Sequence, residues 1–295
     1  MRILFATDGF RPARAGEEMI VGLFDRAKVQ IEVFSVEPDP VVTRPTMDGY
    51  LDLTRSDMPV LGAEAVAREA ADRLAKEGFT TTFDAGKGDP VDEILSAAEK
   101  GTFDLIVLGA SHDSWLGNTL LGSESTHVLH GARRPVLVAH RPPSGRARIL
   151  FGVDGSAGAA SAIEFATNIL DAARCTTEVA MVVHHPIAAG SAYPVGFPTP
   201  VSYSGNAERE RIEAARRLIQ RAGRPLKDAG FAVHEAVLVG GITSQLLKEG
   251  ENIGADLVVV GSRGLGNMRR TLMGSISEQM ARHAPAGLIF RPKDP

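Results

Sequence analysis

Three glycines and a serine near the end of the chain form a pattern that could bind an anion. Gly261 follows the apolar run 257–260, Gly264 comes three residues later, and Gly274 with Ser275 follows after nine more. Glycine lets backbone N–H groups approach a phosphate closely, and a helix opening at Ser275 would attract the same charge. Chance alone gives this spacing in on the order of a few per cent of chains with such glycine content. Taken alone, the same residues also describe a flexible strand-to-helix turn.

The same loop occurs in the first half of the chain with one important change. Gly109 follows an apolar run, and Gly122 with Ser123 completes the pattern, but His112 replaces the second glycine. If that position needs a positive φ, a side chain costs about 1–2 kcal/mol. The imidazole would also fill space that a phosphate needs. We therefore expect weaker or altered binding in this half, while the competing interpretation is that a protonated His112 supports phosphate.

Two copies of one strand-and-helix pattern position these loops. Arg2–Gly9 and Arg148–Gly155 both begin Arg-Ile-Leu-Phe and end Asp-Gly. Strands that alternate with helices indicate parallel, right-handed βαβ units with helices on both faces. The predicted strands cover residues 2–8, 30–36, 79–85, 103–109 and 135–139, and then 148–154, 178–183, 231–239, 255–261 and 286–290.

Helical spacing and helix-boundary residues mark several of the connecting helices. Asp89 followed by Pro90 predicts a helix start, as N-cap and first helical residue. Pro225 is expected to kink or end a helix in the second half. The helices after the first strand of each half are predicted from the apolar residues Ile20, Leu23, Phe24 and Ala27, and Ile163, Ala166, Leu170 and Ala173.

Strand ends should bring separated parts of the chain together. In sheets of this kind ligands bind beyond the carboxyl ends of the strands, where strand order reverses. This rule places Asp154, Gly240 and Gly261 around one crevice with the end of the second strand. Asp154 and Asp8 could instead be plain turn-formers, because Asp-Gly favours turns.

Length, charge and cysteine content limit the classes of protein to which this chain could belong. A chain of 295 residues fits two domains of about 150, here 1–141 and 147–295. A net charge of -4 and a pI near 6.1 give no basic stripe, so neither nucleic acid nor a membrane surface is expected as a partner. The single Cys175 fits a reducing compartment. With no signal-peptide pattern and no apolar run of about 18 residues, we expect a cytoplasmic protein.

These motifs resemble the universal stress protein (UspA-like) family over the whole chain, twice. The resemblance rests on Asp154-Gly-Ser, the glycine turn at Gly240, Val-Val-Gly-Ser-Arg-Gly with Gly-Ser nine residues later, and Pro285 before the last strand. It implies a tandem member of the ATP-binding branch, with two doubly wound α/β domains. Each would hold a five-stranded parallel sheet of order 3-2-1-4-5. ATP would bind with Mg²⁺, the halves would pair through their last strands, and two chains would associate as a homodimer.

The resemblance assigns site residues position by position. Asp154 would contact adenosine, the end of the second strand would flank adenine, and the glycine loop with Ser275 would hold ribose and phosphates. His184 aligns with Val36, but a slip of one residue would put Val183 or His185 there. The implied residues are Asp154, Gly155, Val183, His184, Gly240, Val260, Gly261, Gly264, Gly274, Ser275 and Ile276, and in the first half Asp8, Gly9, Val36, Gly88, Leu108, Gly109, Gly122 and Ser123.

The sequence lacks the motifs of two other classes of nucleotide-binding or hydrolytic protein. The chain has no G-x4-G-K-[ST] and no G-x-S-x-G. The adjacent His184 and His185 would point to opposite faces of an extended strand, so no metal site is expected from them. We expect an ATP-binding regulatory or stress-response switch with little or no hydrolysis. The alternatives are an enzyme that cleaves the α-phosphate to adenylate a substrate, and a nucleotide-free interaction module.

Overall fold

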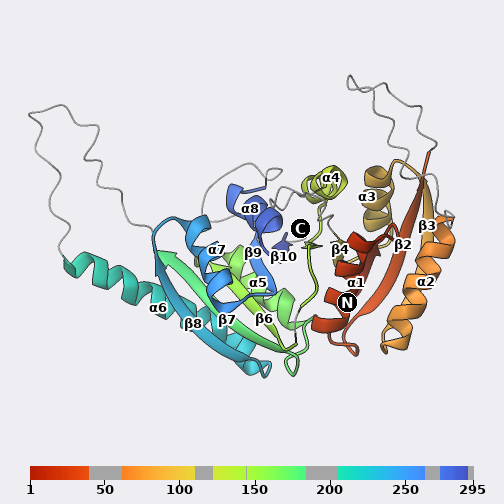
Figure 1. The fold of residues 1–295 in the computed structure, drawn as a ribbon. Helices are drawn as coiled ribbons and strands as arrows, with labels where there is room; N and C mark the ends of the chain where they lie inside the picture. Colours follow the sequence, from red (N-terminus) through yellow and green to blue (C-terminus); the bar gives the residue numbers. More distant parts are fainter. Residues whose placement is uncertain (40–61, 110–121, 144, 184–204, 263–272, 292–295) are drawn as a thin grey trace, which may run out of the picture.

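The computed structural model of the chain describes residues 1–39, 62–109, 122–143, 145–183, 205–262 and 273–291 (Figure 1). The first half contains β1 (Arg2–Ala6), α1 (Arg11–Leu23), β2 (Gln30–Pro38), α2 (Ala63–Lys76), β3 (Thr80–Gly88), α3 (Pro90–Lys100), β4 (Leu105–Gly109), α4 (Ser123–Gly131) and β5 (Val136–Ala139). The second half contains β6 (Ala147–Val153), α5 (Ala157–Thr167), β7 (Cys175–Val183), α6 (Gly205–Asp228), β8 (Ala232–Val239), α7 (Ile242–Ile253), β9 (Leu257–Gly261), α8 (Ser275–His283) and β10 (Ala286–Phe290). Of the helices in these ranges, none has the length and apolar character to cross a bilayer.

The strands form one ten-stranded sheet of order β3-β2-β1-β4-β5-β10-β9-β6-β7-β8. Each half therefore has the predicted order 3-2-1-4-5, and all its strand pairs are parallel. The halves meet where β5 pairs antiparallel with β10, with Leu137 opposite Leu288. The α/β prediction is thus confirmed, and the last strands of the two halves join them into one sheet.

The central strands of the sheet are covered on both faces, because their sequences are apolar on both sides. On β1, Ile3 and Phe5 pack with α1 and α2, whereas Leu4 and Ala6 contribute to the core on the opposite face. The same division holds in the second half: α5 and α6 cover one face and α7 and α8 the other. Continuous apolar strands are typical of parallel sheets that are buried on both sides.

Helices α1 and α5 end earlier than predicted, because residues that follow them form a second contact between the halves. Helix α1 ends at Leu23 and α5 ends at Thr167, so Phe24, Ala27, Leu170 and Ala173 lie outside the helices. Phe24 and Leu170 instead form an antiparallel bridge with each other. The amide of Asp25 donates to the Ile169 carbonyl at 2.8 Å, and the amide of Asp171 donates to the Leu23 carbonyl at 2.8 Å. Phe24 and Leu170 are thus buried by pairing across the two halves, whereas Ala27 and Ala173 are exposed.

Of the two helix-boundary predictions, the one at Asp89 and Pro90 is confirmed and the one at Pro225 needs correction. The Asp89 side chain accepts hydrogen bonds from the amides of Val91 and Asp92, and Pro90 is the first residue of α3 as predicted. Pro225 does not end its helix, which continues to Asp228. It lies in the last turn, where its carbonyl still accepts from the Ala229 amide at 3.0 Å, so its missing N–H removes a hydrogen bond only near the helix end.

Cys175, at the start of β7, should be chemically inert in the folded protein. The side chain is fully buried, and burial, aided by the charge of Asp171, raises the pKa of its thiol to about 12. Because the thiolate is the reactive form, iodoacetamide at pH 8 should modify Cys175 only after denaturation. Mass spectrometry of native and denatured samples measures this, and native labelling at the rate of a free thiol would contradict it.

Candidate functional site

The carboxyl ends of four strands in the second half lie along one edge of the sheet. Val153 of β6 pairs with Met181 of β7, and Val183 pairs with Val239 of β8. On the other side, β6 pairs in register with β9. Because the strands are parallel, the turns that follow them emerge at the same edge, including the residues Asp154, Val183, Gly240 and Gly261. The predicted site residues are therefore on neighbouring strand ends.

The turn after β6 uses the Asp154 carboxylate to form its own geometry. Gly155 has φ +81°, in the region that favours glycine. The Ser156 amide donates to Asp154 Oδ1 at 2.9 Å, and the Ser156 hydroxyl caps α5 by accepting from the Ala159 amide at 3.2 Å. The same turn recurs in the first half, where the Phe10 amide donates to Asp8 Oδ1 at 3.0 Å next to Gly9 at φ +78°. Both aspartates therefore act as turn-formers.

The turn after β8 brings Gly240 against the end of β7. The Gly240 amide donates to the Val183 carbonyl at 3.1 Å. Its φ is +139°, and that of Gly88 in the first half is +135°. A Cβ on Gly240 would lie 2.9 Å from Nε2 of Gln245, so only glycine fits here without a shift. This contact joins two of the predicted site residues directly.

Sheet register corrects one alignment between the halves. Arg2 pairs with Gln30 in the first half, and the equivalent Arg148 pairs with Thr176 in the second. Counting along the strands, Val36 therefore corresponds to residue 182, and its predicted equivalence with His184 is wrong by two residues. A signal was present in the sequence, because Glu32-Val33 in β2 and Glu178-Val179 in β7 fall in the same register. His184 itself lies outside the described residues.

Helix α8 opens beside the end of β9, as the glycine spacing predicts. Gly274 is the N-cap residue, and no side chain of the described residues caps the helix. Two hydrogen bonds hold this opening in place: the Gly274 amide donates to the Ser262 carbonyl at 3.0 Å, and the Ser277 hydroxyl donates to the Gly261 carbonyl at 2.8 Å. An uncapped helix start with N–H groups facing outward is a favourable place for an anion.

Ser277 is the residue that the sequence analysis missed. It is buried, and it links the first turn of α8 to β9. A signal was present, since Gly-Ser-x-Ser occurs at both 274–277 and 122–125. Beside it, Val260 is buried and Ser275 is exposed.

The first half has the same framework around α4, with more open space. Gly122 is the N-cap of α4, again without a side-chain cap, and α4 begins at Ser123. A Cβ on Gly122 would meet no atom within 4 Å, whereas one on Gly274 would lie 3.3 Å from the Ser262 carbonyl oxygen. Leu108 is buried and Gly109 ends β4.

Several predicted features lie outside the described residues. These are Gly264 and His112 in the two loops, together with His185. In the ranges that the structure describes, no group of three or more His, Cys, Asp or Glu side chains could hold a metal ion. Two surface cavities lie away from the strand ends. One lies between α1, α2 and the residues Pro142, Pro143 and Gly145, which connect the two halves. The other lies between α6 and β8.

An acidic pair on the α7 face distinguishes the second half from the first. Glu178 of β7 shares a hydrogen bond with Glu249 of α7, and Oε1 of Glu178 is buried and has no partner among the described residues. Burial, and then the charge of Glu249, raise the pKa of Glu178 from 4.5 to about 7. At the equivalent position of the first half, Glu32 forms an ion pair with Arg2 at 3.3 Å.

Glu178→Gln should stabilise the protein at alkaline pH relative to wild type. The folded state holds the proton more tightly than the unfolded state. The contribution of this carboxyl to the free energy of unfolding is therefore fully present below pH 4.5 and is lost as the pH rises through about 7. One pKa unit corresponds to about 1.4 kcal/mol, and solvent near this half-buried group reduces the effect, so we expect about 1–2 kcal/mol between pH 5.5 and 8.5.

Urea unfolding at both pH values measures the difference between variant and wild type. Glu32→Gln is the matched control, because its carboxylate already has Arg2 as a partner. It should not stabilise the protein at high pH. A difference between Glu178→Gln and wild type that does not change with pH would contradict the assignment.

The fold and the site define a tandem, doubly wound α/β protein with a glycine-framed, uncapped helix start in each half. The model of the universal stress protein family matches residues 1–140 and again 145–289. The chain belongs to this family. A universal stress protein of Mycolicibacterium smegmatis is 30% identical over 236 residues, which cover 78% of this chain and 76% of that protein. Universal stress protein Rv2623 of Mycobacterium tuberculosis is 31% identical over 193 residues, covering 63% of this chain and 60% of that protein.

Solved structures share the fold. A universal stress protein from Archaeoglobus fulgidus aligns with a TM-score of 0.64 at 23% identity, covering 99% of this chain and 98% of its own. One universal stress protein was solved in complex with cAMP. It covers 48% of this chain and 92% of its own at 24% identity, with a TM-score of 0.32, and cAMP is the ligand of that protein.

Proposed function

We propose that this protein binds Mg²⁺-ATP in its C-terminal half and acts as a regulatory switch in a stress response. The observation that carries the proposal is the opening of α8, which has no side-chain cap from the part of the chain that the structure describes and is held against the end of β9 by the Gly274 and Ser277 hydrogen bonds. Helix N–H groups favour phosphate. The adenosine end would lie toward Asp154 and Gly240, at the neighbouring strand ends.

Mg²⁺ fits this arrangement as a partner of the nucleotide. It usually keeps several waters and binds substrate phosphates with few protein ligands. The site residues at the ends of β6 to β9 supply backbone groups, hydroxyls and the Asp154 carboxylate, which accepts the Ser156 amide in its own turn, and we propose none of them as a general base. ATP would therefore persist as a ligand, and differential affinity for two conformations would make it a switch.

The two halves should differ in affinity. The second glycine of the motif is Gly264 in the C-terminal half and His112 in the N-terminal half. Calorimetric titration of the full chain is therefore expected to give one tight site per chain. Two equal sites would contradict this asymmetry without contradicting ATP binding itself.

ATP with Mg²⁺ should raise the thermal unfolding temperature. Ligand at about 100 times its dissociation constant stabilises the folded state by about 2.7 kcal/mol. For a domain of about 150 residues this is a shift of about 5–10 °C. Chromatography of nucleotide released from purified, denatured protein is an independent test. No shift at millimolar ATP together with no retained nucleotide would refute the proposal.

A second candidate is an adenylating enzyme of related adenine-nucleotide fold. It is favoured only by the position of Asp154-Gly-Ser-Ala-Gly, where such enzymes carry a Ser-Gly-Gly-x-Asp-Ser type of loop. Release of pyrophosphate from ATP would support it.

We also propose a homodimer of whole chains, which light scattering after gel filtration would test. Such a dimer needs other surfaces, because β5 and β10 already pair within the chain.

A further inference from the structure

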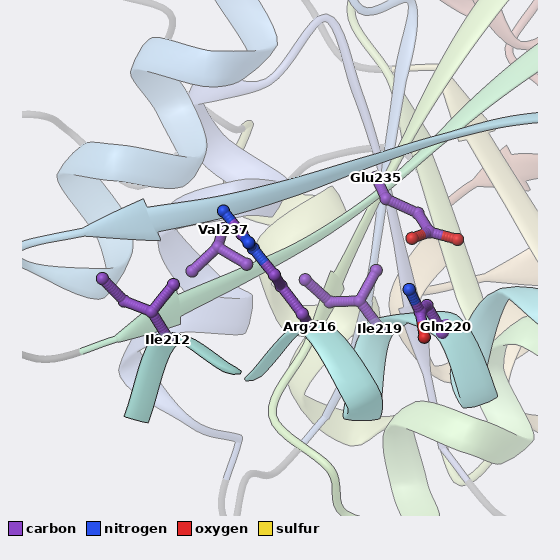
Figure 2. Close-up of a pocket in the computed structure, with 6 residues that line it drawn as sticks. All are labelled: Ile212, Arg216, Ile219, Gln220, Glu235 and Val237. Carbon is purple, nitrogen blue, oxygen red and sulfur yellow. The ribbon is translucent and has the colours of Figure 1, made fainter. Parts of the chain in front are cut away.

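A cavity lies between α6 and β8, at a place where the two halves of the chain differ. It has a volume of about 350 Å³ and is lined by Ile212, Arg216, Ile219, Gln220, Glu235 and Val237 (Figure 2). Its apolar wall comes from both elements, with Ile212 and Ile219 on the helix and Val237 on the strand. Figure 2 shows the Arg216 side chain extending from α6 toward β8. A volume of this size is at the lower end of the range for small-molecule pockets, about 300–1,000 Å³.

In the first half an aromatic residue, partly exposed, stands at the corresponding strand position. Phe83 of β3 holds the position of Glu235, since Gln30 pairs with Thr80 where the equivalent Thr176 pairs with Ala232. The Arg68 guanidinium lies over the Phe83 ring at 5.1 Å from its centroid. The first half therefore has a ring where the second half has a carboxylate, and in the second half this position lines a cavity.

Helix α6 also reaches further than its counterpart. It has 24 residues, whereas α2 has 14. Both end in the same way, because the amides of Phe79 and Phe231 donate to the carbonyls of Leu74 and Leu226. The additional residues are therefore at the start of α6, where Figure 1 shows it projecting past the sheet. Ile212 belongs to this extension, so the wall that it forms has no equivalent on α2.

The charges around the cavity favour an anion. The Glu235 carboxylate is neutralised by Lys227, whose Nζ donates to it at 2.7 Å. Arg216 has no ion-pair partner in the part of the chain that the structure describes, whereas the neighbouring Arg217 pairs with Glu213 at 3.9 Å. A guanidinium binds carboxylates and sulfonates through its planar fork and also stacks on aromatic faces.

We propose that this cavity binds a small aromatic anion. The ring would take the volume that the Phe83 side chain occupies in the first half, against Ile212, Ile219 and Val237. The acidic group would pair with Arg216. The site is separate from the strand-end site and does not depend on ATP binding there.

Titration with 1-anilinonaphthalene-8-sulfonate, an aromatic sulfonate that fluoresces when bound, tests the proposal on the full chain. Wild type should bind one molecule saturably. The double variant Glu235→Phe/Gln220→Arg copies Phe83 and Arg68 and should weaken binding by at least about tenfold. Arg216→Gln should weaken the sulfonate by about tenfold and leave the neutral analogue N-phenyl-1-naphthylamine unaffected.

Arg217→Gln is the matched control on the next residue of the same helix, and thermal unfolding checks that every variant is folded. The proposal is overturned by absent or unsaturable binding in wild type, or by a double variant that is folded and binds like wild type. It is also overturned if Arg216→Gln and Arg217→Gln have equal effects, because the anion would then not be recognised at this cavity.

Discussion

Gly274→Val is expected to abolish the stabilisation of the protein by Mg²⁺-ATP. A Cβ at this position would lie 3.3 Å from the Ser262 carbonyl oxygen, which also accepts the Gly274 amide, so we expect a branched side chain to shift the start of α8 by a few tenths of an ångström relative to the end of β9. The N–H groups proposed to hold the phosphates would move with it. We expect a loss of affinity of about 100-fold or more, and thus loss of the about 5–10 °C shift.

Gly122→Val is the control for this experiment. It is the same substitution at the N-cap of α4, where a Cβ meets no atom within 4 Å. The shift caused by ATP should survive it, because the tight site is assigned to the other half. Unfolding without nucleotide should show a cost of about 1 kcal/mol in both variants, since valine is a poor N-cap. An unchanged ATP shift in a folded Gly274→Val protein would remove α8 from the site.

Gly287→Val is expected to destabilise the folded protein strongly. Gly287 lies in β10 directly beneath α8, and a Cβ would come within 2.9 Å of Ala281 Cα and 3.0 Å of the Met280 carbonyl oxygen. These are backbone atoms of a buried helix turn, so the helix must be displaced. We expect a cost of about 3 kcal/mol, at the upper end for overpacking, measured by urea unfolding.

The equivalent strand position in the first half shows that the helix, rather than the strand, excludes a side chain. Val136 of β5 pairs with Ile106 as Gly287 pairs with Val258. Val136→Ala should cost about 1–2 kcal/mol through a small cavity and leave ATP binding intact. Gly287→Val should weaken ATP binding as well, because α8 carries the proposed phosphate contacts. A cost below about 1 kcal/mol would mean that α8 can adjust its packing freely.

Much of this fold can be predicted from the repeat. Alternating strands and helices give the parallel α/β class of each half, the family resemblance implies the order 3-2-1-4-5, and the apolar runs locate the strands to within two or three residues at most ends. Asp89 with Pro90 locates the start of α3, and Gly274 with Ser275 locates the start of α8. Each of these features is determined by residues that are close together in the sequence.

Long-range contacts account for the errors. Phe24 and Leu170 fit a helical pattern, but each is buried by the other across the two halves, which no local pattern reveals. The offset between Val36 and residue 182 is set by strand pairing, and the local signal for it, Glu32 in β2 and Glu178 in β7, lies earlier in the strands than the predicted site residues. The identity of the ligand stays a prediction, since it depends on the loop 263–272, which lies outside the described residues.

The antiparallel contact of β5 with β10 has a consequence for how the protein responds to its concentration. Two separate subunits part when diluted below their dissociation constant. Here a short tether keeps the partners at an effective local concentration on the order of millimolar, whatever the abundance of the chain. One half can therefore lose its own chemistry over evolutionary time and still serve as the permanent scaffold of the other.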